Sequence, residues 1–179
     1  SANVEVEPVQ VKGCTIKKPS AGSVSKLIKN NITPGAEVGI ILANSTIPMV
    51  GNVFKPGNGD YMWPSCKCGY KLSSKDIYGS LLKCGNQLCS ERLGRMKKVL
   101  NNTNSPKDLD LNKLLVIDRF RWENTQVSID RLVELAASND SSGYYNYLRG
   151  FLKTELQIRN LDLVWMASFK AIQEHVRGK

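Results

Sequence analysis

Short apolar stretches separated by turn residues occupy the first third of the chain. Residues 4–18, VEVEPVQVKGCTIKK, alternate apolar and polar side chains, and residues 33–44 and 45–56 each place an apolar run beside glycine or proline. Alternation is typical of half-buried β-strands, and several short strands separated by turns suit a five-stranded barrel. The intervening stretch SVSKLIKNNI fits either a short helix or an extended arm. The pattern therefore predicts a small β-barrel of the OB-fold type over residues 1–60.

Apolar residues at helical spacing replace this alternation toward the C-terminus, beyond a turn-rich linker at residues 56–64. Residues 90–102 form a short basic helix in this interpretation, and residues 105–179 form a helical domain. We assign two apolar stripes of this domain to its core rather than to a recognition surface. One stripe comprises Tyr144, Tyr147, Leu148, Phe151 and Leu152, and the other comprises Leu161, Val164, Trp165, Phe169, Ile172 and Val176.

Four of the five cysteines lie in the polar stretch between these regions. Cys66, Cys68, Cys84 and Cys89 are spaced as C-x-C, fifteen residues, and C-x4-C. Two short ligand pairs joined by such a loop are a common way to supply the four thiolates of a tetrahedral zinc ion. Reduced structural cysteines and a thiol redox pair are the alternatives, but a redox pair favours C-x-x-C at a helix start. The spacing predicts a closed, structural zinc site within a finger at residues 61–100.

The remaining cysteine and the single histidine offer little chemistry. Cys14 lies in a strand-like run, so we expect it to be a small buried hydrophobe. A cysteine nucleophile needs a nearby base, and His175 is far away in the sequence. We expect His175 to face solvent near a helix end.

Positive charge is concentrated on the cysteine-bearing stretch. The net charge is +9, and residues 61–104 contribute eight Lys/Arg against two Asp/Glu. The electrostatic field of these positive charges would attract a phosphate backbone, although the same charge is also compatible with a basic surface that only keeps the protein soluble. No amphipathic anchor, membrane-length apolar run or signal-peptide pattern accompanies it. We therefore expect a cytoplasmic protein of a bacterium or a phage-infected host, without a membrane partner.

Two patches resemble the C-terminal half of an NAD-dependent DNA ligase. PSCKCGYKL…LKCGNQLCSERL is similar to the family's Cys-Pro-x-Cys-Gly…Leu-x-Cys-x-Asn-x-x-Cys-Pro. ITPGAEVGIILANSTIPMV is similar to a strand-turn-strand ending Arg-Ala-Gly-Asp-Val-Ile-Pro, with Ala43, Ile47 and Pro48 matching. The resemblance covers about residues 8–95. It implies a multidomain α+β fold, in which an OB-fold barrel and a zinc finger precede a degenerate helix-hairpin-helix-like domain.

Departures from the family pattern limit what the chain can do alone. The first cysteine pair is one residue shorter, Leu42 replaces an expected arginine, and Lys18 keeps only the charge of another. The adenylation motif Lys-x-Asp-Gly is absent, as is any glycine-rich phosphate cradle. We therefore expect no reaction with NAD by this chain itself. It is either an excised fragment or one subunit of a split ligase such as a phage could encode, and we favour the split subunit.

The resemblance implies a nick-clamping role in DNA replication and repair. The chain would form a heterodimer with an adenylation subunit, which alone would use NAD, and would position nicked double-stranded DNA for sealing. Zinc would be structural. Ile47 would make an apolar contact with DNA, although it could instead be an ordinary core residue of its strand. The expected DNA contacts are Lys17, Lys18, Lys26, Lys29, Thr46, Ile47, Lys67, Lys71, Lys83, Arg92, Arg95, Lys97 and Lys98.

Two other classes of function remain open from the sequence. One is a non-catalytic zinc-containing OB-fold module that binds single strands or RNA and is unrelated to ligation. Such a module would need exposed aromatic platforms, and Phe54 is the only aromatic residue among residues 1–60. The other is a zinc-stabilised protein-interaction adaptor, which would show no salt-dependent DNA affinity.

Overall fold

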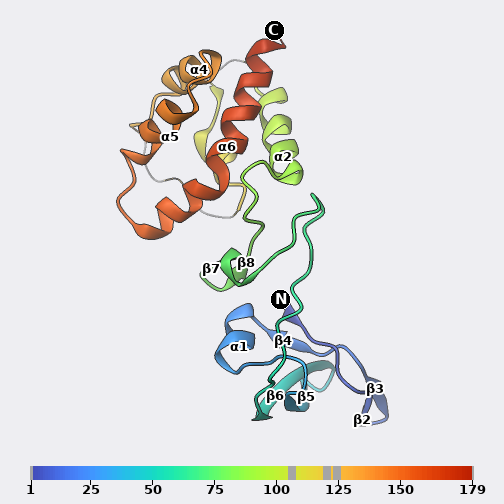
Figure 1. Cartoon of the computed structure of the whole chain (residues 1–179). Helices are drawn as coiled ribbons and strands as arrows, with labels where there is room; N and C mark the ends of the chain where they lie inside the picture. The colour runs from blue at the N-terminus through green and yellow to red at the C-terminus, as the bar shows by residue number, and fades with distance from the viewer. Residues whose placement is uncertain (1, 105–107, 119–121, 123–125, 179) are drawn as a thin grey trace. The chain divides into compact units, whose positions relative to one another are not determined.

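The computed structural model describes residues 2–104, 108–118, 122 and 126–178, and it shows a mixed α+β protein (Figure 1). The chain divides into two compact units, one made of Ser1–Pro64 with Lys71–Lys83 and the other of Ser65–Tyr70 with Cys84–Lys179. The α+β class is therefore confirmed. The three-domain division stays a prediction, and the stretch expected to form the zinc finger contributes residues to both units.

An open four-stranded sheet forms the centre of the first unit. Its strands lie in the order β1 (Ala2–Asn3), β4 (Ser20–Gly22), β6 (Ile47–Lys55), β5 (Glu37–Ala43). The β5–β6 pair is antiparallel, whereas β4 runs parallel to β6. Two separate hairpins complete the strands, and they are β2 (Val9–Val11) with β3 (Cys14–Ile16), and β7 (Ile77–Tyr78) with β8 (Leu81–Leu82). The OB-fold barrel itself stays a prediction.

The stretch SVSKLIKNNI, for which the sequence allowed either a short helix or an extended arm, contains the helix α1 (Val24–Lys29). Ser23 caps it, because its side chain accepts a hydrogen bond from the backbone N–H of Lys26. The helix buries Leu27 against Ala21, Ile32 and Val50 of the sheet core. A cap and one buried leucine therefore decide between the two alternatives.

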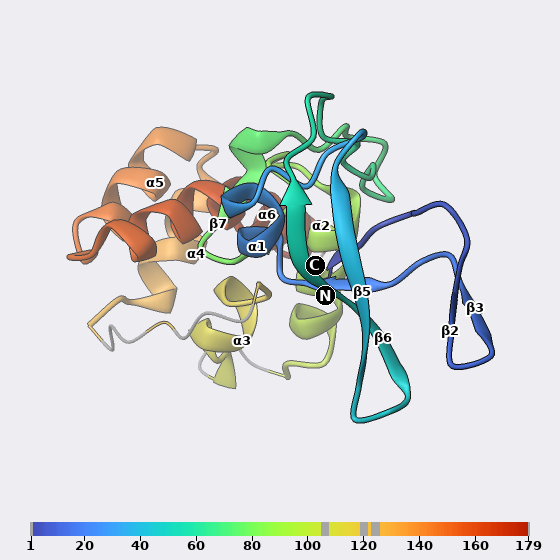
Figure 2. The ribbon, with the colours of Figure 1, turned by 90° about the horizontal axis from the view of Figure 1, so that it is seen from below.

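Tight turns close the β2–β3 and β5–β6 hairpins of the first unit. The central turn residues are Lys12 and Gly13 in one hairpin and Asn44 and Ser45 in the other, and all four have positive φ. The β2–β3 loop has two residues, and positive φ at both matches the twist of such hairpins. The β5–β6 loop has one residue more, and the N–H of Thr46 donates to the carbonyl of Ala43 at 3.1 Å. The β2–β3 and β5–β6 hairpins lie beside one another (Figure 2). Cys14 at the end of β2–β3 is exposed, so the prediction of a buried thiol is wrong, because a two-stranded hairpin leaves this side chain uncovered.

Helices build the second unit around the long α6 (Glu155–Arg177), which packs against α2 (Ser90–Asn101), α3 (Leu111–Leu115), α4 (Ile129–Ala137) and α5 (Ser141–Arg149) (Figure 1). The core between them is apolar and includes Met96, Leu114, Leu132, Tyr144, Leu148, Leu161, Val164, Phe169 and Ile172. Even α6 lacks an apolar stretch that could cross a membrane, as do the other helices of the described residues. The helix-hairpin-helix likeness stays a prediction.

The stripe expected at residues 144–152 is helical only as far as Arg149. Helix α5 ends at Arg149, and α6 begins after Thr154, so Phe151 and Leu152 lie between the helices and only partly buried. Thr154 and Gln157 form a capping box that starts the new helix. The first stripe therefore contributes only its Tyr144 and Leu148 to the fully buried core. His175 is half-buried rather than fully solvent-facing.

Candidate metal centre and nucleic-acid surface

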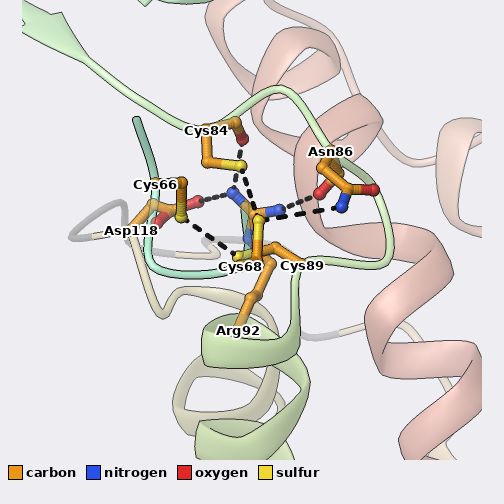
Figure 3. A network of polar contacts seen from close by, with 7 residues as sticks. All are labelled: Cys66, Cys68, Cys84, Asn86, Cys89, Arg92 and Asp118. Carbon is orange, nitrogen blue, oxygen red and sulfur yellow. Dashed lines mark hydrogen bonds and ion pairs between the residues drawn. The ribbon is translucent and has the colours of Figure 1, made fainter. Parts of the chain in front are cut away.

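Four cysteine sulfurs converge within the second unit. One pair lies on the turn Ser65–Tyr70, and the other lies on the segment that leads into α2. All four Sγ atoms lie within 4.8 Å of one another, and the Cys66–Cys89 and Cys68–Cys84 Sγ distances are both 3.7 Å (Figure 3). A tetrahedron with Zn–S bonds of about 2.3 Å has edges of about 3.8 Å. The four thiols could therefore bind a metal ion such as zinc, as the cysteine spacing predicts.

A tight turn makes the short C-x-C spacing workable. The backbone N–H of Cys66 donates to the carbonyl of Tyr70 at 2.9 Å, and that of Gly69 donates to the carbonyl of Cys66 at 2.9 Å. Gly69 has a φ of 90°, which glycine adopts without a side-chain clash. The turn directs Cys66 and Cys68 toward the second pair although a single residue separates them.

Asn86 shapes the second half of the site, and the sequence analysis did not single it out. Its carbonyl accepts the N–H of Cys89 at 3.1 Å, and its side-chain oxygen accepts the N–H of Leu88 at 3.1 Å. Its side-chain amide lies 3.8 Å from the sulfur of Cys68 (Figure 3). An amide near a ligand sulfur is the kind of outer contact that orients metal ligands.

Cys68 and Cys84 differ strongly in the pKa of their thiols. A hydrogen bond from the backbone of Tyr70 lowers the pKa of Cys68 to about 6. Burial raises the pKa of Cys84 to about 12. Without a cation, the cluster therefore cannot carry four negative charges at neutral pH. A bound metal ion would supply the compensating charge and keep every sulfur deprotonated.

Arg92 lies inside this site, although the sequence suggested that it would contact DNA. Its side chain is 2% exposed and extends from α2 into the middle of the polar network (Figure 3). The guanidinium donates to the carbonyls of Asn86 at 2.8 Å and Cys84 at 3.0 Å, and it pairs with Asp118 at 3.3 Å. A DNA contact is incompatible with this burial, so that prediction is corrected.

Three lysines among the expected DNA contacts are also engaged within the protein. The Lys26 ammonium donates to the carbonyl of Val50 at 2.7 Å, Lys97 pairs with Glu174, and Lys83 is only 8% exposed. The two contacts and the burial of Lys83 reduce the charge that these residues can offer to a phosphate. The remaining expected contacts are exposed, and they are Lys17, Lys18, Lys29, Thr46, Ile47, Lys67, Lys71, Arg95 and Lys98.

A groove of about 460 Å³ in the first unit brings part of this set together. Lys17, Lys18 and Thr46 line it, with Cys14–Ile16, Leu42, Ser45 and Pro48. Ile47 follows Thr46 and is 50% exposed, so it is not the core residue that the sequence left open. Cationic side chains, a hydroxyl and an exposed aliphatic side chain thus gather at the end of the β5–β6 hairpin.

The fold and the cysteine cluster define a class of protein, namely a mixed α+β chain with a candidate four-thiol metal centre. No protein-family model matches the chain. A DNA ligase from Desulfatibacillum aliphaticivorans is 28% identical over 91 residues, which cover 50% of this chain and 14% of the ligase. The chain therefore spans only a small part of the length of that relative.

Proposed function

We propose that the chain is the DNA-binding, nick-clamping part of an NAD-dependent DNA ligase. The similarity to a DNA ligase over 91 residues carries this proposal. The four-cysteine cluster supports it, because it fits the zinc-finger region expected in the C-terminal part of such a ligase. In this proposal the first unit is an OB-fold, the metal is zinc, and residues 105–179 are a shortened helix-hairpin-helix domain.

The groove of the first unit supports a clamping role. Sealing a nick requires the 3′-hydroxyl and the 5′-phosphate to be held in line, so positioning and charge neutralisation contribute much of the catalysis. Lys17 and Lys18 would pair with backbone phosphates, and Thr46 would add a hydroxyl donor. The exposed Ile47 would make an apolar contact in the minor groove, where such side chains favour altered duplex geometry.

Chemistry at the phosphate would come from a second polypeptide. The chain has no Lys-x-Asp-Gly motif, so the adenylation step and the use of NAD belong to a partner subunit in this proposal. The two chains would form a heterodimer on nicked duplex, in DNA replication or repair. Zinc would hold the cysteine-bearing loops and would not take part in the reaction.

The test is reconstitution with an NAD-type adenylation subunit from the same source. The mixture should seal a labelled nicked duplex in the presence of NAD, and neither chain should do so alone. The Lys17→Gln/Lys18→Gln variant should reduce sealing at low enzyme concentration by weakening DNA binding. Failure of the two chains to associate, or sealing that does not depend on this chain, would remove the split-ligase proposal.

One observation favours the alternative of a module that binds single-stranded nucleic acid without ligation. Phe54 is 71% exposed, so the first unit does carry an aromatic side chain that a base could stack on. Competition between nicked duplex and single strands of equal length separates the two functions. Preference for the single strand, abolished by Phe54→Ala, would support the alternative, and no salt-dependent affinity for either would indicate a protein adaptor.

A further inference from the structure

Arg92 joins three segments of the second unit that are separated in sequence. It lies in the first turn of α2, and its guanidinium reaches the carbonyls of Cys84 and Asn86 at 3.0 and 2.8 Å. The same group pairs at 3.3 Å with Asp118, which follows α3. The cysteine-bearing loop, α2 and the segment after α3 are thus held by one side chain that is 2% exposed.

We propose that Arg92 is a positioning residue of the metal centre, and that it couples metal binding to the folding of the helical unit. Both carbonyls that it holds belong to the loop carrying Cys84 and Cys89. If this loop moved, the guanidinium would lose partners in a buried environment, which is costly. The guanidinium of Arg92 therefore holds Cys84 and Cys89 where they can bind the same metal ion as Cys66 and Cys68.

The charge of Arg92 acts in the same direction as its geometry. Four thiolates around one divalent ion carry two net negative charges, so a buried cation beside them favours the metal-loaded state. Asp118 pairs with this cation at 3.3 Å and balances its charge, so the geometry of the Arg92 hydrogen bonds carries the proposal. By linkage, whatever tightens metal binding to the folded unit also makes the metal stabilise that unit more.

A purely structural role for Arg92 makes a different prediction. Removing one partner of a buried ion pair is strongly destabilising, because the other charge stays buried without its counter-ion. A structural arginine would therefore alter the loaded and metal-free proteins alike and leave zinc affinity unchanged. Zinc affinity is the readout that separates the two roles, and it requires neither DNA nor a partner subunit, so its outcome is independent of the proposed function.

The experiment measures the zinc affinity of the full chain by competition with a chromophoric chelator, and the absorption spectrum of the Co²⁺-substituted protein. Arg92→Met and Arg92→Lys are compared with Arg95→Met, a control because Arg95 is exposed on the same helix. Both Arg92 variants should bind zinc about 10- to 100-fold more weakly, the usual loss when an outer-shell partner of a metal site is removed. Lysine should fail because a single ammonium cannot reproduce the planar fork.

Several results would overturn the proposal. Unchanged zinc affinity and an unchanged Co²⁺ spectrum in both Arg92 variants would assign the residue to the fold alone. Failure of both variants to fold in a large excess of zinc would do the same, because a site weakened 100-fold would still be filled there. Full affinity in Arg92→Lys with a loss in Arg92→Met would show that charge, and not positioning, is responsible. Parent protein that binds no zinc would remove the premise.

Discussion

Replacing both Lys17 and Lys18 by glutamine tests whether the groove of the first unit holds DNA phosphates. The two side chains line the same groove and are exposed, so neither is expected to be needed for folding. Glutamine keeps much of the side-chain length and removes the charge. The variant should therefore weaken DNA binding without lowering the melting temperature.

The size of the effect follows from counterion release. Each phosphate neutralised on duplex DNA contributes about 0.9 to the slope of log K against log salt concentration. Loss of two contacts should reduce that slope by about 1.8. Over the tenfold change from 1 M to 0.1 M salt, the difference in affinity between the parent and the variant should therefore grow to about 60-fold. At 1 M salt the parent and the variant should bind almost equally.

Fluorescence anisotropy on a labelled nicked duplex, measured at several salt concentrations, gives both slopes. Lys26→Gln serves as the matched control, because the Lys26 ammonium is already bound to the carbonyl of Val50. This control should leave the slope unchanged, although it loses one internal hydrogen bond. If the double variant kept the parent slope, or if Lys26→Gln reduced it equally, the assignment of the groove to phosphates would be refuted.

Three further predictions concern the second unit. Lowering the pH should release the metal, because binding requires the thiolate of Cys84, whose pKa burial raises to about 12, and protons compete for it; zinc content after dialysis at pH 8 and pH 5 checks this. Tyr144→Phe should lower the free energy of unfolding by about 0.5–1.5 kcal/mol, because it removes the buried hydroxyl and its 2.9 Å hydrogen bond with Ser168, as urea denaturation would show. Burial raises the pKa of Tyr144, so parent stability should fall as the pH rises above about 10, where the unfolded tyrosine ionises first, and this fall should be smaller in the variant. Leu148→Ala should cost about 2–5 kcal/mol, because Leu148 is 0% exposed, whereas exposed Leu156→Ala should cost far less in the same assay.

Local signals in the sequence were sufficient for several features. The ligand set of the metal centre was predictable, because two short cysteine pairs leave few other ways to gather four thiols. The cap of α1 by Ser23 and the capping box of Thr154 and Gln157 depend on residues within one turn of each helix start. The second of these signals was present and was overlooked, so the division between α5 and α6 could also have been predicted.

The roles of the basic side chains could not be predicted from local signals in the sequence. Arg92, Lys97 and Lys26 look like surface cations in the sequence, yet each meets a partner far along the chain. Arg92 pairs with Asp118 across 26 positions, and no short-range pattern brings those two residues together. Which charges stay free for a ligand therefore depends on packing.

Charge density and cysteine spacing are properties of neighbouring residues, so the sequence alone determined a basic chain with a candidate tetrahedral thiol site. The tertiary structure decided that Arg92 belongs to the interior of that site and that Cys14 lies exposed beside Lys17 and Lys18 in a groove. The physical reason is that burial and ion pairing are set by segments distant in sequence. Only the folded chain brings those segments together.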